Sequence, residues 1–495
     1  MKIIAMYLPQ FHTIPENDLW WGEGYTEWTA VKSAESVTND HYQPRVPLDG
    51  NYYDLLNKET MEWQADLMHK YGVYGMCFYH YYFENGRRVL EKPAENLLKW
   101  HDINMPFCFS WANETWARSW SRISGTNAWN SKLEKQDGKD GILIRQDYGD
   151  ESLWREHLEY LIPFFNDERY IRVNDRPVFI IHKPGDIHCL ERMKDKWNEW
   201  ASEYGIPGVF FIGVNSNDGS LDATMQQEAN YSDLFIPSVN KSYEELSEQI
   251  ITNAYVSDDN CYLCATPGYD DTPRRGKSGE IVYGSTPEKF YEQLKALIYL
   301  SEQKGKDMLF VNAWNEWGEG MYLEPDERFG YGYLEAIKRA QDNASFTDEE
   351  VDKINRVIRE GAIRQLRMQR EKILKFKDTS DLFEKMLLLK ESDRSMAHQL
   401  KEKGIGSVAV YGLGKIGKHV LEDLRNEGVA IAFGIDNKVT SQAFDFAVYD
   451  SEMVLPKTDL IIMTFNDEIE KNRLSSVVDC PVLTIRELVD SAGKC

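Results

Sequence analysis

Eight short apolar runs lie before residue 340 and constrain the fold of this chain more than any other feature. They cover residues 2–8, 73–82, 105–112, 177–183, 208–214, 233–239, 261–268 and 308–314. Runs this continuously apolar are typical of strands that are buried on both faces of a parallel sheet. The stretches between them, such as 57–72 and 286–305, carry apolar residues at helical spacing and end in Gly. The pattern predicts an α/β fold, a (β/α)8 TIM barrel over residues 1–344.

Residues 345–402 differ in composition from the barrel region, because charged residues dominate and apolar residues recur at helical spacing. We expect a helical linker there, formed by a pair of amphipathic helices that join two domains or pack on the barrel. Self-association through these helices is an alternative, although no sustained heptad repeat is evident.

The last region, 403–495, predicts a small Rossmann-like parallel α/β domain. An apolar run from Ser407 leads into Gly412, Gly414 and Gly417 in the pattern G-x-G-x-x-G, and Asp436 ends the next run. Bare backbone amides at a helix N-terminus suit a pyrophosphate, so a nucleotide or nucleotide-sugar is a possible ligand of these four residues. The alternative is a module for packing or assembly, since the region is short and no separate domain for hydride transfer is apparent.

The net charge of -24 argues against nucleic acid as the main partner. Phosphate recognition depends on Lys and Arg surfaces, and no basic patch of that kind is visible. By the same reasoning we expect an anionic membrane surface to repel the chain. Aromatic residues make up 13% of the chain, and where they meet polar groups they suit a carbohydrate ligand, although a large aromatic core explains many of them.

Seven cysteines at irregular spacing do not indicate a disulfide framework. Cys261 and Cys264 lie in a predicted strand, where positions i and i+3 face opposite sides, so we expect a structural role for them and no metal site. The first residues lack the basic segment and long apolar run of a signal peptide. No apolar run approaches the roughly 18–20 residues that span a bilayer. We therefore expect a cytoplasmic protein without a transmembrane segment.

Polar and aromatic residues follow five of the predicted strands, where a (β/α)8 barrel carries its functional groups. Because the carboxyl ends of the strands meet at one rim, we expect these side chains around a shared site. The residues, in strand order, are Gln10 and His12, then Tyr79, His80, Tyr81 and Tyr82, then Trp111, Asn113, Glu114 and Trp116, then Tyr269, Asp270 and Asp271, and finally Asn315, Glu316 and Glu319.

Glu316 and Glu319 form a candidate catalytic pair. Making or breaking a glycosidic bond needs a proton donor at the bridging oxygen and a second group at the sugar, and paired carboxylates commonly supply both. At a strand end that turns toward a helix, two residues three apart can share one face, and Gly318 permits such a turn. Trp314 and Trp317 could exclude water and raise the pKa of one carboxyl. The alternative is an ordinary turn whose acids face water.

Seven motifs follow one another through the barrel region: YLPQFH, WWGEGYTEW, HYQPR, FYHYYF, EKPAENLL, WANETW and NAWNEWGEG. In this order they resemble the WbsX-type proteins of bacterial surface-polysaccharide gene clusters, which are related to glycoside hydrolase family 99, the endo-α-mannosidase group. The resemblance covers residues 1 to about 340. It implies a (β/α)8 barrel with metal-independent, retaining chemistry that requires no cofactor, on a mannose-type substrate.

The family 99 motif E-W-x-E implies separate roles for the two glutamates. Glu316 would be the base toward the 2-hydroxyl of the substrate, which attacks the anomeric carbon and gives a 1,2-anhydro sugar. Glu319 would be the acid/base at the leaving oxygen. Gly318 stands where family 99 typically has His, so we expect a substrate contact to be missing there. The motifs of the first three strands belong to the WbsX branch, which leaves the identity of the sugar open.

Candidate substrate-binding residues complete the predicted site, and each of them could equally hold a loop or fill the core. The stacking candidates are Trp20, Trp21, Trp28, Trp111 and Trp116, and the candidates for hydroxyl groups are Gln10, His12, Glu27, His80, Asn113, Glu114, Tyr269 and Asn315. Three functions fit this site. They are a glycosidase-like enzyme acting on O-antigen or capsule glycans, a glycosyltransferase that takes its sugar from an activated carrier, and an inactive glycan-binding scaffold.

Overall fold

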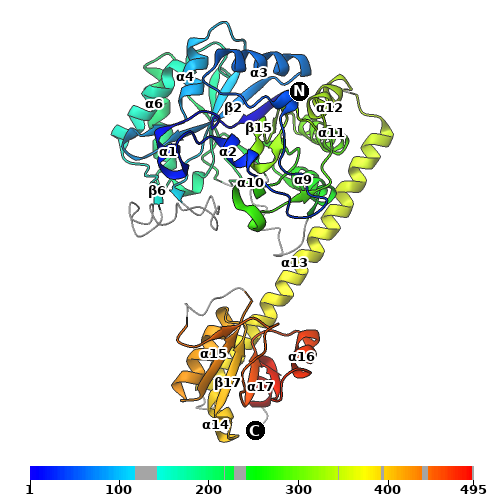
Figure 1. Ribbon diagram of the computed structural model, residues 1–495. Helices are drawn as coiled ribbons and strands as arrows, with labels where there is room; N and C mark the ends of the chain where they lie inside the picture. Colours follow the sequence, from blue (N-terminus) through cyan, green and yellow to red (C-terminus); the bar gives the residue numbers. More distant parts are fainter. Residues whose placement is uncertain are drawn as a thin grey trace. The chain divides into compact units, whose positions relative to one another are not determined.

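The structure is a computed structural model that describes residues 1–117, 142–216, 218–227, 241–343, 345–391, 395–437 and 444–492. The chain divides into two compact units, Met1–Ile363 and Arg364–Cys495 (Figure 1). Residue 344, the predicted end of the barrel domain, lies outside the described residues. The finer division into a barrel, a linker and a third region therefore stays a prediction.

The first unit is a closed barrel of eight parallel strands, which confirms the predicted (β/α)8 fold (Figure 1). The strands run in the order β1-β2-β4-β8-β9-β10-β12-β14, and β14 pairs with β1 to close the ring. Their bounds are β1 Lys2–Tyr7, β2 Gly75–Tyr82, β4 Phe107–Trp111, β8 Arg176–Ile181, β9 Phe210–Val214, β10 Ala223–Gln226, β12 Cys261–Ala265 and β14 Met308–Val311.

The apolar runs form strands because both of their faces are buried. Ile4 on β1 lies in register with Gly75 on β2 and with Phe310 on β14, and all three are in the barrel wall. Side chains of one strand face fill the barrel, and those of the other face pack under the surrounding helices. A Cβ at Gly75 would lie 2.6 Å from the carbonyl oxygen of Pro106, so only glycine allows this close approach of β2 to its neighbour.

Helices surround the barrel on its outer side (Figure 1). The main ones are α3 Lys58–Tyr71, α4 Lys92–Lys99, α6 Glu151–Phe165, α7 Leu190–Ser202, α9 Tyr243–Val256, α11 Pro287–Gln303 and α12 Gly332–Asp342. The connection from β9 to β10 departs from the predicted pattern, because its described residues form a turn without a helix. The hydrogen bond from Asn215 N to Met225 O, of 2.9 Å, ties the two strand ends together directly.

The sixth barrel strand is not the one that the apolar runs predict. Residues 233–239 lie outside the described residues, and the position between β9 and β12 belongs to β10. Its sequence ATMQ is short, and its side chains alternate between buried and partly buried. Four residues with polar members carry too little apolar signal to be recognised as a barrel strand.

Shorter elements lie in the loops of the barrel unit. Those at the carboxyl ends of its strands position the site. They are α1 Pro15–Trp21, α2 Glu27–Lys32, β5 Trp116–Ala117, β6 Ile142–Ile144, α10 Thr272–Arg275, β15 Asn315–Glu316, the 3-10 turn Trp317–Glu319 and β16 Met321–Tyr322. The remaining short strands are β3 Arg88–Val89, β7 Arg172–Val173, β11 Lys241–Ser242 and β13 Val282–Tyr283.

The predicted linker contains one long helix, α13 Asp348–Glu391, followed by the short α14 Met396–Glu402. The sequence predicts a pair of amphipathic helices of similar kind, whereas α13 alone runs through 44 residues. Strong helix formers such as Leu, Lys and Glu fill this stretch, and neither Gly nor Pro interrupts it after Gly361. The boundary between the two compact units falls within this helix.

The second unit contains the predicted parallel sheet, with the strand order β19-β18-β17-β20-β21. The order 3-2-1-4-5 is that of a doubly wound sheet. Its elements are β17 Ser407–Tyr411, α15 Lys415–Asn426, β18 Ala430–Ile435, β19 Val448–Tyr449, β20 Leu460–Met463, α16 Glu468–Ser475, β21 Val482–Thr484 and α17 Ile485–Ala492. Gly414 caps α15, so the glycine motif lies at the strand-to-helix turn, as expected.

Two further expectations concern cysteines and membrane spans. Among the described residues no disulfide bond joins the cysteines, and Cys261 and Cys264 are buried on β12. None of the described helices has a stretch long and apolar enough to cross a bilayer.

Candidate active site

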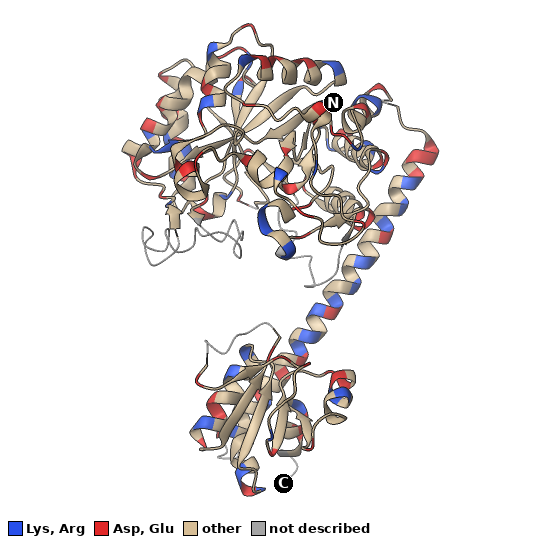
Figure 2. Cartoon of the chain, in the orientation of Figure 1, with Lys and Arg blue, Asp and Glu red and all other residues tan. Residues whose placement is uncertain are grey.

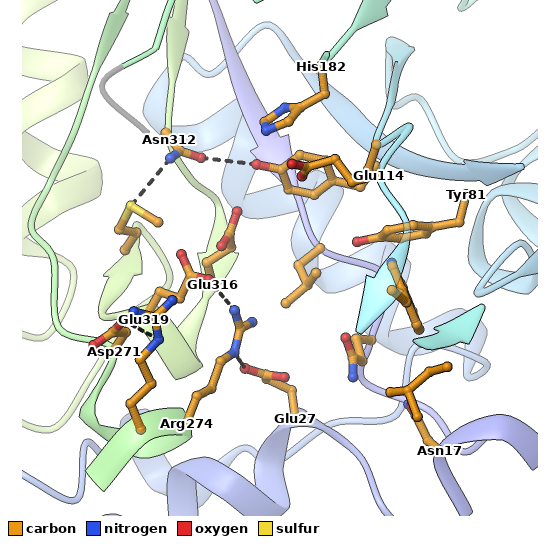
Figure 3. Close-up of a pocket in the computed structure, with 18 of the residues that line it drawn as sticks. Asn17, Glu27, Tyr81, Glu114, His182, Asp271, Arg274, Asn312, Glu316 and Glu319 are labelled. Carbon is orange, nitrogen blue, oxygen red and sulfur yellow. Dashed lines mark hydrogen bonds and ion pairs between the residues drawn. The ribbon is translucent and has the colours of Figure 1, made fainter. Parts of the chain in front are cut away.

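A cavity of about 420 Å³ opens at the carboxyl ends of the barrel strands (Figure 3). Every strand of the barrel except β9 contributes a lining residue from its end or from the loop that follows. The lining residues are Leu8, Gln10, Asn17, Trp20, Trp21, Tyr25, Glu27, Tyr79, Tyr81, Ala112, Glu114, Trp116, Leu143, His182, Lys183, Gln227, Tyr269, Asp271, Arg274, Arg275, Asn312, Glu316, Glu319 and Met321. Aromatic and polar groups thus meet in one concave site, as ligand pockets require.

Glu316 lies at the inner wall of this cavity, on the short strand β15 that follows β14. The residue is only 5% exposed. Burial, followed by the charge of Glu319, raises its pKa well above the usual range. The charge of Arg274 and the hydroxyl of Tyr79 oppose this rise in pKa but do not cancel it. Glu316 therefore tends to hold a proton in the unliganded protein.

Arg274 lies between Glu27 and Glu319 and forms an ion pair with each (Figure 3). Its Nε donates to Glu27 Oε1 at 2.8 Å, and its Nη1 donates to Glu319 Oε1. Glu27 is almost fully buried, at 1% exposure, and Arg274 is the basic side chain that lies against its carboxyl group. The two glutamates of the candidate pair thus differ in environment, because Glu319 has a cation beside it and Glu316 lies deeper in the wall.

The ion pair of Glu27 with Arg274 requires a glycine at position 318, between Glu316 and Glu319. A Cβ at Gly318 would lie 1.8 Å from Glu27 Oε1 and 3.0 Å from Arg274 Nε. Any other residue at this position would displace the ion pair that holds Glu319. The absence of a His at position 318, which the family comparison presented as a missing contact, has a steric reason in this chain.

The charged groups of the lining are paired. Its three Lys and Arg side chains each lie against a carboxylate: Arg274 as described, Arg275 at 3.0 Å from Asp271, and Lys183 at 3.7 Å from Glu114. Burial raises the pKa of Asp271 to about 6 although Arg275 opposes the shift. Burial also raises the pKa of Glu114. Five carboxyl groups and three Lys or Arg side chains line the cavity, so its described lining carries no excess of positive charge.

Aromatic rings form the opposite wall. Trp116 packs edge-on against Trp20, with ring centroids 5.8 Å apart, and against Tyr81, at 5.2 Å. Trp21 lies beside Tyr25, at 6.0 Å. Rings fixed in this way offer an apolar surface that loses little conformational entropy when a sugar face stacks on it.

A buried carboxylate supports the strand end that carries Glu316. Glu324 accepts four hydrogen bonds of 2.8 to 2.9 Å, from the Trp314 and Trp317 indoles, the Tyr53 hydroxyl and the Gln64 amide. Burial raises its pKa to about 7 in spite of these donors. The two tryptophans flank Glu316 in sequence, so the network fixes the turn on both sides of it.

The cavity brings together nine of the candidate catalytic and substrate-binding residues. They are Gln10, Trp20, Trp21, Glu27, Glu114, Trp116, Tyr269, Glu316 and Glu319. Six others do not line it: His12, Trp28, His80, Trp111, Asn113 and Asn315.

His80 and Trp111 face away from the cavity because side chains alternate along a strand. Tyr79 and Tyr81 line the cavity, while His80 between them points to the helix layer, where its Nε2 lies 2.8 Å from Nε2 of His157. Trp111 also packs on His157, with ring centroids 4.9 Å apart. Both side chains belong to the packing between the barrel and α6.

Asn113 and Asn315 hold the cavity walls instead of lining them. The Asn113 amide accepts from Lys183 N at 2.7 Å and donates to Lys183 O at 2.8 Å. In the same way, the Asn315 amide accepts from Leu8 N at 2.7 Å and donates to Leu8 O at 3.0 Å. Each side chain thus replaces a missing strand neighbour at a strand end.

Trp28 and His12 are buried behind the site. Trp28 packs on Phe11, Tyr53 and Trp317, and its indole donates to the carbonyl of Tyr53 at 2.8 Å. His12 is 1% exposed, and burial lowers its pKa.

Arg274 is a lining residue of the candidate site that the sequence does not predict. It follows the β12 strand end by only nine residues, in the segment YDDTPRR, and that position was the available signal. Other lining residues that were not predicted include His182, Lys183 and Asn312, whereas Tyr79, Tyr81 and Asp271 lie at strand ends that the sequence places on the rim. Within the described parts of the chain, no group of three or more His, Cys, Asp or Glu side chains is placed to hold a metal ion.

Comparison with solved structures gives distant likenesses. The glycoside hydrolase family 99 endo-α-mannosidase of Bacteroides thetaiotaomicron, in complex with bis-tris propane, is 16% identical, covers 69% of this chain and 96% of its own, and has a TM-score of 0.42. A glycoside hydrolase-like protein is 14% identical, covers 68% of this chain and 93% of its own, and has a TM-score of 0.43.

Sequence comparison gives nearer relatives. The WxcX proteins of two strains of Xanthomonas campestris pv. campestris, one of them B100, are 31% and 32% identical over 363 and 364 residues. These matches cover 68% of this chain, and the chain spans about half the length of these relatives, 49% in each case. The family described as glycosyltransferase WbsX matches residues 3–337, the whole of the barrel. The chain therefore belongs to the WbsX glycosyltransferase family.

Proposed function

We propose that the barrel cavity binds a sugar and that Glu316 and Glu319 make or break a glycosidic bond at its anomeric carbon. The observation that carries the proposal is the pairing of two unlike glutamates in one aromatic cavity. Glu316 is buried with a raised pKa, and Glu319 is ion-paired with Arg274. Two neighbouring carboxyl groups that repel each other hold one proton between them more readily than they both ionise, which gives one acid and one base.

The proposed chemistry proceeds through a 1,2-anhydro sugar with retention of configuration. In the first step Glu316 takes the proton of the 2-hydroxyl, O2 attacks C1, the C1–O bond to the leaving group breaks, and the leaving oxygen takes a proton from Glu319. In the second step a water or sugar hydroxyl loses its proton to Glu319 and attacks C1. The C1–O2 bond then breaks, and O2 takes its proton back from Glu316.

This order of events requires a proton to change place. In the unliganded protein the raised pKa of Glu316 favours the proton on Glu316, and Glu319 is the carboxylate partner of Arg274. We propose that sugar binding moves the proton from Glu316 to Glu319, and that Glu27 then neutralises Arg274. The reverse assignment, with Glu316 as the acid and Glu319 as the base, follows if the proton stays.

The paired charges favour a neutral sugar as the ligand of the cavity. The diphosphate group of a nucleoside diphosphate sugar would need Lys, Arg or a metal ion to offset its negative charge. The described lining instead has three Lys or Arg side chains, each held by a carboxylate, and two further glutamates. The hydroxyls of a neutral hexose match the amide and carboxyl groups of Gln10, Glu114 and Asn312.

We place this activity in the biosynthesis of bacterial surface polysaccharide in the cytoplasm, with a mannose-type sugar as the first substrate to test. Hydrolysis is the direct reading of the glutamate pair. Transfer to a sugar acceptor is the second candidate, and the description of the family as glycosyltransferases supports it. The two differ only in whether water or a sugar hydroxyl enters in the second step.

Product analysis tests the proposal and separates the two candidates. The full chain is incubated with α-mannosides, alone and with an acceptor sugar, and in parallel with nucleotide-activated sugars. Free mannose indicates hydrolysis, and a lengthened acceptor indicates transfer. Transfer from the nucleotide-activated sugar alone would contradict the preference for a neutral donor. Binding of sugar without any product would favour the glycan-binding scaffold.

A nucleotide or nucleotide-sugar ligand for the second unit is a separate proposal. A Cβ at Gly414 would meet nothing within 4 Å, so space is open at the start of α15. Against this, Asp436 already accepts from Leu413 N at 2.9 Å and puts a carboxylate at the same turn. Calorimetric titration of the full chain with nucleoside diphosphates and nucleotide sugars tests it. Binding that Gly414→Leu abolishes would support the ligand, and no binding at millimolar concentration would favour a packing role.

A further inference from the structure

The middle of α13 is a helical segment with exposed side chains. Every residue from 366 to 377 is exposed. Before this stretch Ile354 and Ile358 are buried in the core of the barrel unit, and after it Leu382 is buried in the core of the second unit. We call the segment 364–377 the α13 midsegment; among the described residues, its large apolar side chains belong to neither buried core.

Three large apolar side chains form a row along one side of the α13 midsegment, while Met368 and Leu374, 43% and 51% exposed, lie off this row. Leu366, Ile373 and Phe376 are 66%, 65% and 75% exposed. They are seven and three residues apart, which places them along one side of a helix. Large apolar side chains that are scattered singly are common on protein surfaces, but a row of them on one helix face marks an interaction site.

The α13 midsegment is also strongly basic. It contains six Lys or Arg residues and one Glu, a net charge of +5 in a chain whose net charge is -24. Figure 2 shows these basic residues along α13. At physiological salt, charges act over about 8 Å, so the local charge of an exposed helix decides which surface it meets. The expectation from the overall charge, that an anionic membrane would repel the chain, does not hold for this segment.

We propose that the α13 midsegment docks on an anionic lipid bilayer surface, with its axis in the plane of the interface. A helix with Lys and Arg on its polar sides and Leu, Ile and Phe on the other is the kind that inserts its apolar face at the headgroup boundary. The basic side chains would meet the anionic headgroups. The proposal is independent of the chemistry in the barrel.

A second copy of the chain fits the same segment less well. A row of residues at 366, 369, 373 and 376 is the seam of a parallel coiled coil, but position 369 is Gln. In that arrangement Lys372 of one copy would face Lys377 of the other. Like charges at these flanking positions oppose pairing, whereas an anionic surface accepts both.

Vesicle co-sedimentation of the full chain tests the proposal. The vesicles are pure phosphatidylcholine or phosphatidylcholine with about one third phosphatidylglycerol. We expect the bound fraction to rise at least about ten-fold with the anionic lipid and to fall again at high salt. Equal binding to both vesicles, or binding to neither, would overturn the proposal.

Two sets of variants locate the contact. The first replaces Leu366, Ile373 and Phe376 by Gln, and the second replaces Arg367, Arg370 and Lys375 by Gln; glutamine preserves helix propensity. Each set should reduce binding to anionic vesicles about ten-fold or more, with an unchanged circular dichroism spectrum. The control variant replaces Val454 and Ile469 by Gln. These side chains are 95% and 85% exposed in the second unit, and the variant should bind anionic vesicles like the wild type.

Light scattering of the protein without vesicles distinguishes self-association of the α13 midsegment from membrane binding. A wild-type dimer that the Leu366, Ile373 and Phe376 variant converts to a monomer would assign the apolar row to self-association and overturn the proposal. The same oligomeric state in the wild type and the variant, with vesicle binding lost, supports it.

Discussion

The carboxylate of Glu27 occupies the space that a side chain at position 318 would need. A Cβ at Gly318 would lie 1.8 Å from Glu27 Oε1. Since Glu27 in turn pairs with Arg274, and Arg274 with Glu319, this close approach couples the glycine to the candidate catalytic pair. The glycine and the buried acid are therefore parts of one arrangement.

Replacing Gly318 by Ala should disrupt that arrangement. Relief of the overlap would shift Glu27 and Arg274, and displacements of this kind reduce turnover by up to about 100-fold. Overpacking should also lower the free energy of unfolding by about 1 to 3 kcal/mol. Steady-state kinetics and chemical denaturation measure the two effects. The matched control is Gly219→Ala, where a Cβ meets nothing within 4 Å. Wild-type kinetics for Gly318→Ala would show that the ion pair does not position Glu319.

Removing Arg274 should shift the pH dependence of activity. Arg274 lowers the pKa of Glu316, against burial and the charge of Glu319, so Arg274→Met raises that pKa further. The limb of the kcat/KM profile that Glu316 governs should move to higher pH. Arg192→Met is the control, because Arg192 pairs with Glu151 on the surface and its side chain is 70% exposed. A profile that moves to lower pH, or stays in place, would contradict the assigned electrostatics.

Activated substrates should distinguish the acid from the base. An aryl glycoside with a good leaving group needs no proton at its leaving oxygen, so the variant that lacks the acid keeps its first step. If Glu319 is the acid, Glu319→Gln should be far more active on the aryl glycoside than on an unactivated mannoside, and Glu316→Gln should be inactive on both. The opposite pattern would assign the acid to Glu316, as the unliganded electrostatics favour.

Replacing Glu324 by Gln should destabilise the barrel. Each oxygen of Glu324 accepts hydrogen bonds from two donors. In Glu324→Gln an NH2 group replaces one of these oxygens and cannot accept, and an unpaired buried donor costs about 1 to 3 kcal/mol. The exposed Glu327, which accepts from Asp49 N, provides the control Glu327→Gln. Thermal or urea denaturation of both variants measures the difference.

The effect of Glu324 should also depend on pH. Burial raises its pKa to about 7, above that of an exposed carboxyl, so the folded state holds this proton more tightly than the unfolded state. The resulting stability is fully present below the unfolded pKa and is lost as pH rises through about 7. The stability gap between the wild type and Glu324→Gln should therefore narrow from pH 5 to pH 8. A constant gap would mean that Glu324 is ionised in both states.

The sequence predicts seven of the barrel strands because each is a long apolar run buried on both faces. It misses β10, because ATMQ is too short and too polar to stand out. The ring of helices follows from helical spacing, except between β9 and β10, where a loop suffices. Burial patterns thus reveal strands that carry much of the core, and only barrel closure reveals the one that carries little.

Strand ends predict where the site lies but not which side chains enter it. His80 and Trp111 sit at the correct ends, yet alternation turns them toward α6 and puts Tyr79 and Tyr81 in the cavity. The sequence does not show which face of each strand points into the barrel, because apolar residues occupy both faces. Arg274 was missed for another reason, since only the fold brings it between Glu27 and Glu319.

The most direct test of the account compares turnover of the wild type, Glu316→Gln and Glu319→Gln on an unactivated mannoside, with Glu327→Gln as the control. If the two glutamates act as the pair proposed above, turnover should fall by about 100- to 10,000-fold in both site variants, with folding intact, and the control should keep wild-type turnover. Unchanged turnover in both site variants would contradict the assignment of Glu316 and Glu319 as the pair that acts on the glycosidic bond.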